Sequence, residues 1–103
     1  MTHRDMDDRS PEEPARARLL ITGRVQGVGY RAFTRQAASR RGLSGGVRNL
    51  DNGHVEVDVE GMKDLIEDMI KQLKIGPPGS RVQQIHIEWA IASGRFADFQ
   101  IWY

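Results

Sequence analysis

The sequence contains no cysteine and no long hydrophobic run, and both absences narrow the class of protein. Without cysteine there can be no disulfide scaffold, no thiol nucleophile and no zinc site built on thiolates. No apolar stretch approaches the roughly 20 residues that a membrane-spanning helix needs, and the first ten residues lack the apolar core of a secretory signal. The 103 residues fit one domain, which we expect to be cytoplasmic and without membrane contact.

Acidic residues are absent from one long segment of the chain. Residues 15–50 contain eight arginines and no Asp or Glu, a charge of +8, whereas residues 1–14 carry −3 and residues 51–103 carry −4. A basic segment of this kind suits an anionic partner. It suits equally well a solvated surface, or a set of arginines that pair with acids from the C-terminal half. Charge alone does not separate the two interpretations.

The N-terminal segment, residues 1–14, differs in composition from the rest of the chain. It carries two prolines and many charges, and almost nothing apolar. Such a segment has too little apolar surface to bury, which predicts a disordered leader. We therefore expect the folded domain to comprise residues 15–103.

Hydrophobic periodicity divides this domain into strands and helices. Alternation with a period of two marks strands, and His54–Glu60, with its three valines, is the cleanest. Recurrence every three or four residues marks two amphipathic helices. The predicted order is strand 18–23, helix 30–41, strand 43–50, strand 54–60, helix 62–73, strand 85–89 and a short final strand 99–103.

This order predicts an α+β fold, a ferredoxin-like βαββαβ sandwich. Each helix connects two strands and has one apolar stripe. Both helices are therefore expected on one face of an antiparallel sheet, with the other face largely solvated. Between the second and third strands, Asp51-Asn52-Gly53 predicts a tight type I′ hairpin, because Asn-Gly tolerates the positive φ angles of that turn.

A glycine-rich segment, Gly23–Arg31, links the first strand to the first helix. Its glycines let successive amides point inward, and the positive end of the helix dipole adds to an anion-binding concavity. Arg31 lies in the first helical turn, where a cation is slightly unfavourable, so its side chain suggests another role. Its planar fork can bind two phosphate oxygens. The segment fits neither a Walker A loop nor a dinucleotide fingerprint, which leaves another kind of phosphate cradle or a simple glycine turn.

Two motifs resemble the signatures of the acylphosphatase family. The first is Gly23–Arg31, and the second is Asn49–Val55 followed by Gly61. The resemblance extends over about residues 17–103, nearly the whole predicted domain. It implies a small ferredoxin-like enzyme that hydrolyses the carboxyl–phosphate bond of acyl phosphates without a metal or cofactor.

The resemblance also implies roles for particular residues. Arg31 would hold the phosphoryl oxygens, and Asn49 would orient the attacking water. The amide of Asn49 can donate and accept without changing charge, and a carboxylate leaving group needs positioning and charge stabilisation more than a strong base. The backbone amides that would complete the substrate-binding cradle are those of Val25, Gln26, Gly27, Val28, Gly29 and Tyr30.

Two positions depart from the family's usual pattern. Gly46 stands where the family usually has an aromatic residue, three residues before Asn49. Its effect is expected on the second strand and the pocket wall. Tyr30 replaces the commoner Phe and adds a hydroxyl group. Neither departure touches the residues to which the resemblance gives a catalytic role.

Two other functions fit a ferredoxin-like domain. RNA-recognition domains share the topology, but His54–Glu60 offers acids where such domains place stacking aromatics. A non-catalytic module would bind phosphate at the loop without hydrolysis. His54 and His86 have no second ligand at metal spacing, so no metal site is expected. We expect a monomer that binds a small acyl phosphate and phosphate, and neither nucleic acid nor membranes.

Overall fold

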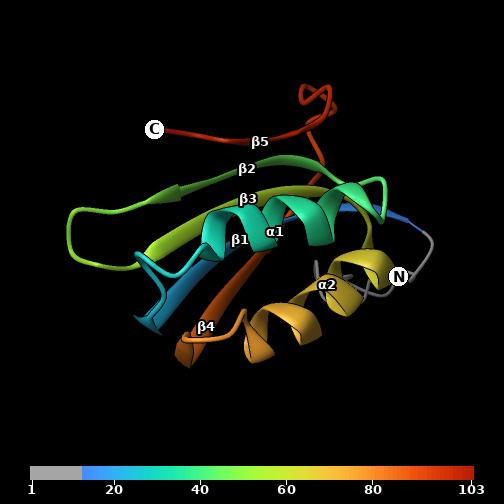
Figure 1. Cartoon of the computed structure of the whole chain (residues 1–103). Helices are drawn as coiled ribbons and strands as arrows, with labels where there is room; N and C mark the ends of the chain where they lie inside the picture. Colours follow the sequence, from blue (N-terminus) through green and yellow to red (C-terminus); the bar gives the residue numbers. More distant parts are fainter. Residues whose placement is uncertain (1–12) are drawn as a thin grey trace.

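The computed structural model describes residues 13–103 (Figure 1). Residues 1–12 of the predicted leader lie outside the described residues. The last residue of that predicted leader, Pro14, already belongs to the first strand. All seven predicted elements are present, and the first and fourth strands are several residues longer than predicted. The elements are β1 (Pro14–Arg24), α1 (Tyr30–Ser39), β2 (Ser44–Asn49), β3 (Val55–Met62), α2 (Lys63–Ile75), β4 (Arg81–Ala90) and β5 (Phe99–Ile101).

The five strands form one sheet in the order β4-β1-β3-β2-β5. The pairs β1–β3, β1–β4 and β2–β3 are antiparallel, as predicted, but β5 runs parallel to β2. The prediction of a wholly antiparallel sheet is therefore wrong at this edge. After β4 the chain crosses to the opposite edge of the sheet and then runs alongside β2 in the same direction (Figure 1).

Both helices cover one face of the sheet, as predicted, and the core lies between the two layers (Figure 1). Val55, Val57 and Val59 of β3 are fully buried there, so their alternation correctly identified the core face. The helices contribute their apolar stripes, with Tyr30, Ala37 and Ala38 from α1 and Ile66, Met69, Ile70 and Leu73 from α2. No helix among residues 13–103 is long and apolar enough to cross a membrane.

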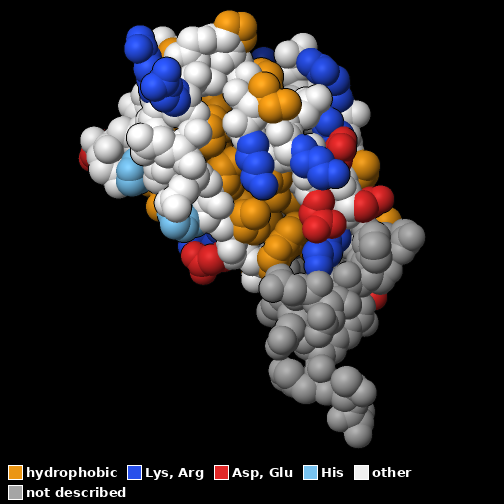
Figure 2. Space-filling view, turned by 90° about the horizontal axis from the view of Figure 1, so that it is seen from below, with side chains coloured by type: hydrophobic (Ala, Val, Ile, Leu, Met, Phe, Trp, Pro, Cys, Tyr) orange, Lys and Arg blue, Asp and Glu red, His pale blue; other side chains and the backbone are white. Residues whose placement is uncertain are grey.

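The helix-covered face is less completely closed at the β4 edge. This strand packs against α2, yet Ile87 keeps 39% of its surface exposed. Figure 2 shows hydrophobic side chains at the surface between basic and acidic ones. The alternation of Ile85, Ile87 and Trp89 thus predicted the strand, but the edge position leaves its apolar face partly open. The groove between α2 and β4 is lined by Glu67, Ile70, Lys71, Lys74, Ile87 and Trp89.

The opposite face of the sheet is not solvated at its centre, contrary to the prediction. Asp58 and Glu60 of β3 are only 9% and 4% exposed. Arg16 of β1 donates to both carboxylate oxygens of Asp58, at 2.8 and 2.6 Å. Glu60 accepts hydrogen bonds from the Ser93 amide and hydroxyl and from the Gly94 amide, at 2.6–2.9 Å. Buried charges need such partners, which the alternation of valines and acids does not specify.

Half of the arginines in the basic segment 15–50 form ion pairs with acids from later in the chain. The pairs are Arg16–Asp58, Arg18–Glu56, Arg48–Glu56 and Arg41–Asp68. The interpretation of the segment as an ion-paired surface therefore holds for these four residues. Within residues 13–103 the other four, Arg24, Arg31, Arg35 and Arg40, have no acidic side chain at ion-pairing distance.

The hairpin between β2 and β3 is not the predicted type I′ turn. Gly53 has a φ of 91°, but no described residue other than glycine has a positive φ, so Asn52 lacks the left-handed conformation that type I′ requires. The amide of Gly53 donates to the Leu50 carbonyl at 3.1 Å, and the amide of Leu50 donates to the His54 carbonyl at 2.8 Å. These bonds define a three-residue loop in which a type I turn is followed by a glycine bulge.

Glu60→Gln is expected to lower the free energy of unfolding at neutral pH by about 1–3 kcal/mol, because a neutral amide accepts weaker hydrogen bonds than a carboxylate. Burial alone would raise the pKa of Glu60, but the hydrogen bonds from Ser93 and Gly94 and the charge of Arg16 bring its pKa below the ordinary value of 4.5. A pKa lowered by folding gives stability that is present above 4.5 and is lost as the pH falls through the folded-state value.

Urea unfolding of the wild type and Glu60→Gln at neutral pH and at about pH 3 measures this effect. The difference in free energy of unfolding should shrink at the acid pH, because the stability that the charged carboxylate contributes is lost as the pH falls below 4.5 towards the lowered folded-state pKa. Glu67→Gln, at an exposed position of α2, is the matched control and should change little at either pH. An equal deficit for Glu60→Gln at both pH values would contradict the role given to its charge.

Candidate active site

The turn from β1 into α1 depends on two glycines with positive φ. Gly27 has a φ of 75°, and Gly29, which caps α1, has a φ of 77°. A Cβ at either position would meet no atom within 4 Å, so glycine is required for its conformation and not for lack of space. No side chain caps the helix and its first turn contains no acidic residue. The first amides of α1 therefore remain available to a bound anion.

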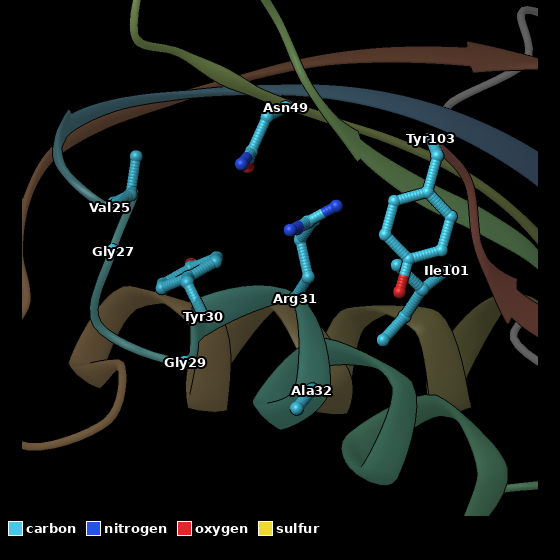
Figure 3. A pocket seen from close by; sticks show the side chains of 9 residues that line it. All are labelled: Val25, Gly27, Gly29, Tyr30, Arg31, Ala32, Asn49, Ile101 and Tyr103. Atoms are coloured by element: carbon cyan, nitrogen blue, oxygen red, sulfur yellow. The ribbon is translucent and has the colours of Figure 1, made fainter.

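A pocket of about 200 Å³ lies where this turn meets the end of β2 and the last residues of the chain (Figure 3). Arg31 from α1 and Asn49 from β2 both direct their side chains into it (Figure 3). All the predicted site residues except Gln26 and Val28 line this pocket. The lining consists of Val25, Gly27, Gly29, Tyr30, Arg31, Ala32, Asn49, Ile101 and Tyr103.

Arg31 brings a positive charge to the pocket that no acid neutralises within residues 13–103. Its Cζ atom lies 5.1 Å from the centre of the Tyr103 ring, a cation–π arrangement. The ring supports the guanidinium without using up its hydrogen-bond donors. The planar fork of donors is therefore available to the oxygens of an anion.

Asn49 brings a buried amide oxygen to the same pocket. It is the last residue of β2 and lies on the helix-covered face with Val47, two residues before it. Its Oδ1 atom is buried and has no hydrogen-bond partner among the described residues. A buried acceptor is costly to leave unpaired. The position therefore suits a bound molecule with an O–H or N–H donor.

The side chains of two predicted binding residues are engaged outside the pocket. Nε2 of Gln26 donates to the carbonyls of Leu50, at 2.8 Å, and His54, at 2.9 Å. These bonds tie the glycine-rich loop to the β2–β3 hairpin, directly after Asn49. Val28 packs against the hydrophobic core. Only the backbone amides of Gln26 and Val28 remain as candidates for substrate binding, which is the contribution predicted for them.

The hydroxyl of Tyr30, one of the two departures from the family pattern, has a structural partner. Tyr30 is 1% exposed, and its hydroxyl donates to the Leu73 carbonyl at 2.7 Å. Burial raises the pKa of this hydroxyl above its ordinary value of 10. The bond joins the start of α1 to the last part of α2. The extra oxygen therefore supports the helix packing behind the pocket.

Three pocket residues, Ala32, Ile101 and Tyr103, were not predicted. Tyr103 was expected in the final strand 99–103, but it lies beyond β5, it is fully exposed and its ring lies beside Arg31 (Figure 3). The alternation of Phe99, Ile101 and Tyr103 does place these side chains on one face. The parallel pairing of β5 with β2 brings that face to the pocket, and this pairing has no local signal in the sequence.

The pocket thus combines a guanidinium, an amide oxygen and the free amides of a helix N-terminus. Such an arrangement suits a phosphoryl group, because these donors match its oxygens and its negative charge. No group of three or more His, Asp or Glu side chains in the described part of the chain is arranged to hold a metal ion. Fold and pocket together define a small ferredoxin-like protein of the phosphate-binding class.

Comparison with known proteins narrows this class to one family. The acylphosphatase family model matches residues 17–101. An acylphosphatase of Nostoc sp. is 47% identical over 79 residues, which are 77% of this chain and 78% of that protein. An acylphosphatase of Pyrobaculum arsenaticum is 42% identical over 90 residues, 86% of this chain and 95% of that protein. The crystal structure of the Bacillus subtilis acylphosphatase superimposes with a TM-score of 0.84 at 35% identity, covering 86% of this chain and 99% of that one.

The chain belongs to the acylphosphatase family. Its activity is that of an acylphosphatase, a hydrolase of acyl phosphates, as the two sequence motifs implied. The structural similarity confirms the ferredoxin-like α+β fold as well. These relatives do not favour the alternative of a non-catalytic phosphate- or RNA-binding module.

Proposed function

We propose that this pocket hydrolyses small acyl phosphates to a carboxylate and inorganic phosphate. Arg31 holds the phosphoryl oxygens, the backbone amides of residues 25–30 complete the cradle, and Asn49 orients the attacking water. The observation that carries the proposal is that two polar groups available to a ligand face one pocket. The guanidinium of Arg31 and the buried Oδ1 of Asn49, which has no hydrogen-bond partner among residues 13–103, face the same small pocket (Figure 3).

The phosphoryl group is held by positive charge and by hydrogen-bond donors that point toward its oxygens. The guanidinium of Arg31 offers two parallel N–H donors that match two phosphoryl oxygens. The N-terminus of α1 adds its partial positive charge and the amides that the helix leaves unpaired. These groups are fixed before the substrate arrives, so they stabilise the charge of the transition state without reorganisation.

The water is held by Asn49 on the side of the pocket formed by β2. Oδ1 accepts a hydrogen bond from the water, which leaves a lone pair on the water oxygen free to attack phosphorus. The new P–O bond forms as the bond between phosphorus and the acyl oxygen breaks, and that electron pair leaves on the carboxylate. The protons of the water pass to the phosphate product and solvent. A carboxylate is a good leaving group, so no strong base is required.

The size of the pocket suits a small substrate. Its volume of about 200 Å³ is below the roughly 300–1,000 Å³ of sites that enclose drug-sized ligands. A phosphoryl group with a short acyl chain fills such a space. A longer acyl chain would extend past Tyr103, which is fully exposed at the pocket rim.

We also propose that the enzyme acts as a monomer in the cytoplasm and without nucleic acid. Arg31, Asn49 and the glycine-rich loop that form the pocket all belong to one chain, which supports a monomer, and the lack of cysteine suits a reducing compartment. On the sheet face opposite the helices, Glu56, Asp58 and Glu60 stand where RNA-recognition domains place stacking aromatics. These acids are paired with arginines and with the backbone near Ser93, so β3 offers no aromatic ring on which a base could stack.

Arg31→Ala is expected to abolish phosphate binding and turnover, because it removes the charge and the paired donors that hold the phosphoryl group. Release of phosphate from a synthetic acyl phosphate, with a chelator present, measures turnover, and isothermal calorimetry with orthophosphate measures binding. Arg35→Ala is the matched control, since Arg35 is exposed on the same helix and lies outside the pocket. Turnover in Arg31→Ala at the level of Arg35→Ala would rule out the role of Arg31.

Asn49→Ala is expected to lower kcat by about 10²–10³-fold and to leave phosphate binding largely intact, because it removes one positioning group for the water. Steady-state kinetics with inhibition by orthophosphate separate the two effects. Asn52→Ala, in the exposed turn of the adjacent hairpin, is the matched control and should keep the wild-type kcat. Full activity of Asn49→Ala would show that Asn49 does not orient the water.

A further inference from the structure

The indole of Trp102 covers Gly46 of β2. Gly46 is buried, although it lies on the face of the sheet opposite to Val47 and the helices. A Cβ atom at Gly46 would overlap with the Cε2, Cζ2 and Cδ2 atoms of Trp102. The φ of Gly46 is not positive, so its backbone conformation would accept a side chain. The contact with the indole therefore makes glycine necessary here.

Trp102 also lies at the point where the chain end is attached to β2. Its amide donates to the Val47 carbonyl at 2.8 Å, and its ring lies 5.9 Å from the ring of Phe96. The adjoining strand β5 has three residues and forms the edge of the sheet. Phe99, which is 5% exposed, anchors β5 on the helix-covered face of the sheet. Trp102 anchors it on the opposite face.

The residues on either side of Trp102 form one wall of the pocket. Ile101 and Tyr103 both line it, as expected for neighbours of a residue that points to the opposite face. The Tyr103 ring lies 5.1 Å from Cζ of Arg31 (Figure 3). A contact that fixes Trp102 on the sheet face opposite the helices therefore also fixes Ile101 and Tyr103 on the pocket side.

We propose that Trp102 is a positioning residue of the active site. Its indole packs on Gly46, fastens the chain end to β2 and so keeps Tyr103 against Arg31. Position 102 thereby supplies the ring that the resemblance led us to expect at position 46. The inference rests on the proposed role of Arg31 in holding phosphate.

Asn49 does not depend on this contact. It is paired with Val55 of β3, on the side of β2 away from β5. Loss of the indole is therefore expected to loosen the wall beside Arg31 while the water-orienting amide stays in place. The consequence is weaker binding of the phosphoryl group, with a smaller effect on the chemical step, because the guanidinium and the water-orienting amide are both still present.

Trp102→Ala is expected to raise KM for a synthetic acyl phosphate by about fivefold or more, and to weaken inhibition by orthophosphate in parallel, with kcat within about twofold of the wild type. A merely structural loss lowers the folded fraction, which reduces the apparent kcat at an unchanged KM. Trp89→Ala is the matched control, because Trp89 lies on β4 and outside the pocket. It should leave KM unchanged.

Moving the indole from position 102 to position 46 of β2 gives a sharper test. Gly46→Trp alone should raise KM, because the two indoles compete for one space. Gly46→Trp combined with Trp102→Ala should bring KM back toward the wild-type value. The KM of the double variant should therefore lie below the value expected from adding the two single effects. Gly46→Ala removes no contact but displaces the indole, so it should raise KM even if Trp102→Ala does not fold.

Three results would overturn the role of Trp102. They are a wild-type KM in a folded Trp102→Ala variant, a wild-type KM in Gly46→Ala, or strictly additive effects in the double variant. Binding of orthophosphate by Arg31→Ala distinguishes a failure of the role of Trp102 from a failure of the proposed site. If Arg31→Ala still binds orthophosphate, the proposed site is wrong. If it loses binding while Trp102→Ala keeps the wild-type KM, only the role of Trp102 is wrong.

Discussion

The left-handed conformation of Gly27 and Gly29 is the constraint on which the rest of the site depends. It lets β1 turn directly into α1, so that Arg31 lies in the first helical turn beside amides without internal partners. The loop then reaches the end of β2, where Gln26 bonds to the two carbonyls of the hairpin that follows Asn49. A side chain at either glycine would have room but would strain the backbone, and the cradle would open.

The charge of +8 on residues 15–50 has two different uses in the folded protein. Arg16, Arg18, Arg41 and Arg48 neutralise acids from the C-terminal half, and Arg16 does so for the buried Asp58. Arg31 instead faces a small pocket and has an aromatic ring as its neighbour. The ion-pair interpretation of the basic segment is therefore confirmed for these four arginines, and the anionic-partner interpretation stays a prediction that applies to Arg31. A pocket with one arginine that no acid among the described residues neutralises suits a small phosphoryl group.

Local patterns predicted what depends on local residues. The order of the elements, the core face of β3 and the glycine-rich loop with Arg31 could be predicted from periodicity and composition. Features that depend on partners distant in the sequence could not. The parallel pairing of β5 with β2, the burial of Asp58 and Glu60, and the position of Tyr103 beside Arg31 are of this kind. Gly46 was recognised as unusual, but only the fold shows that Trp102 fills the space it leaves.

The most direct test of the phosphate cradle follows the amide resonances of the protein by heteronuclear NMR while orthophosphate is added. If the loop and Arg31 hold the phosphoryl group, saturable shifts should appear at the amides of Gly27, Gly29 and Tyr30 and at the side-chain amide of Asn49. The same shifts should be absent in Arg31→Ala. Shifts that cluster away from the loop, or that persist in Arg31→Ala, would contradict the central claim that this pocket binds the phosphoryl group.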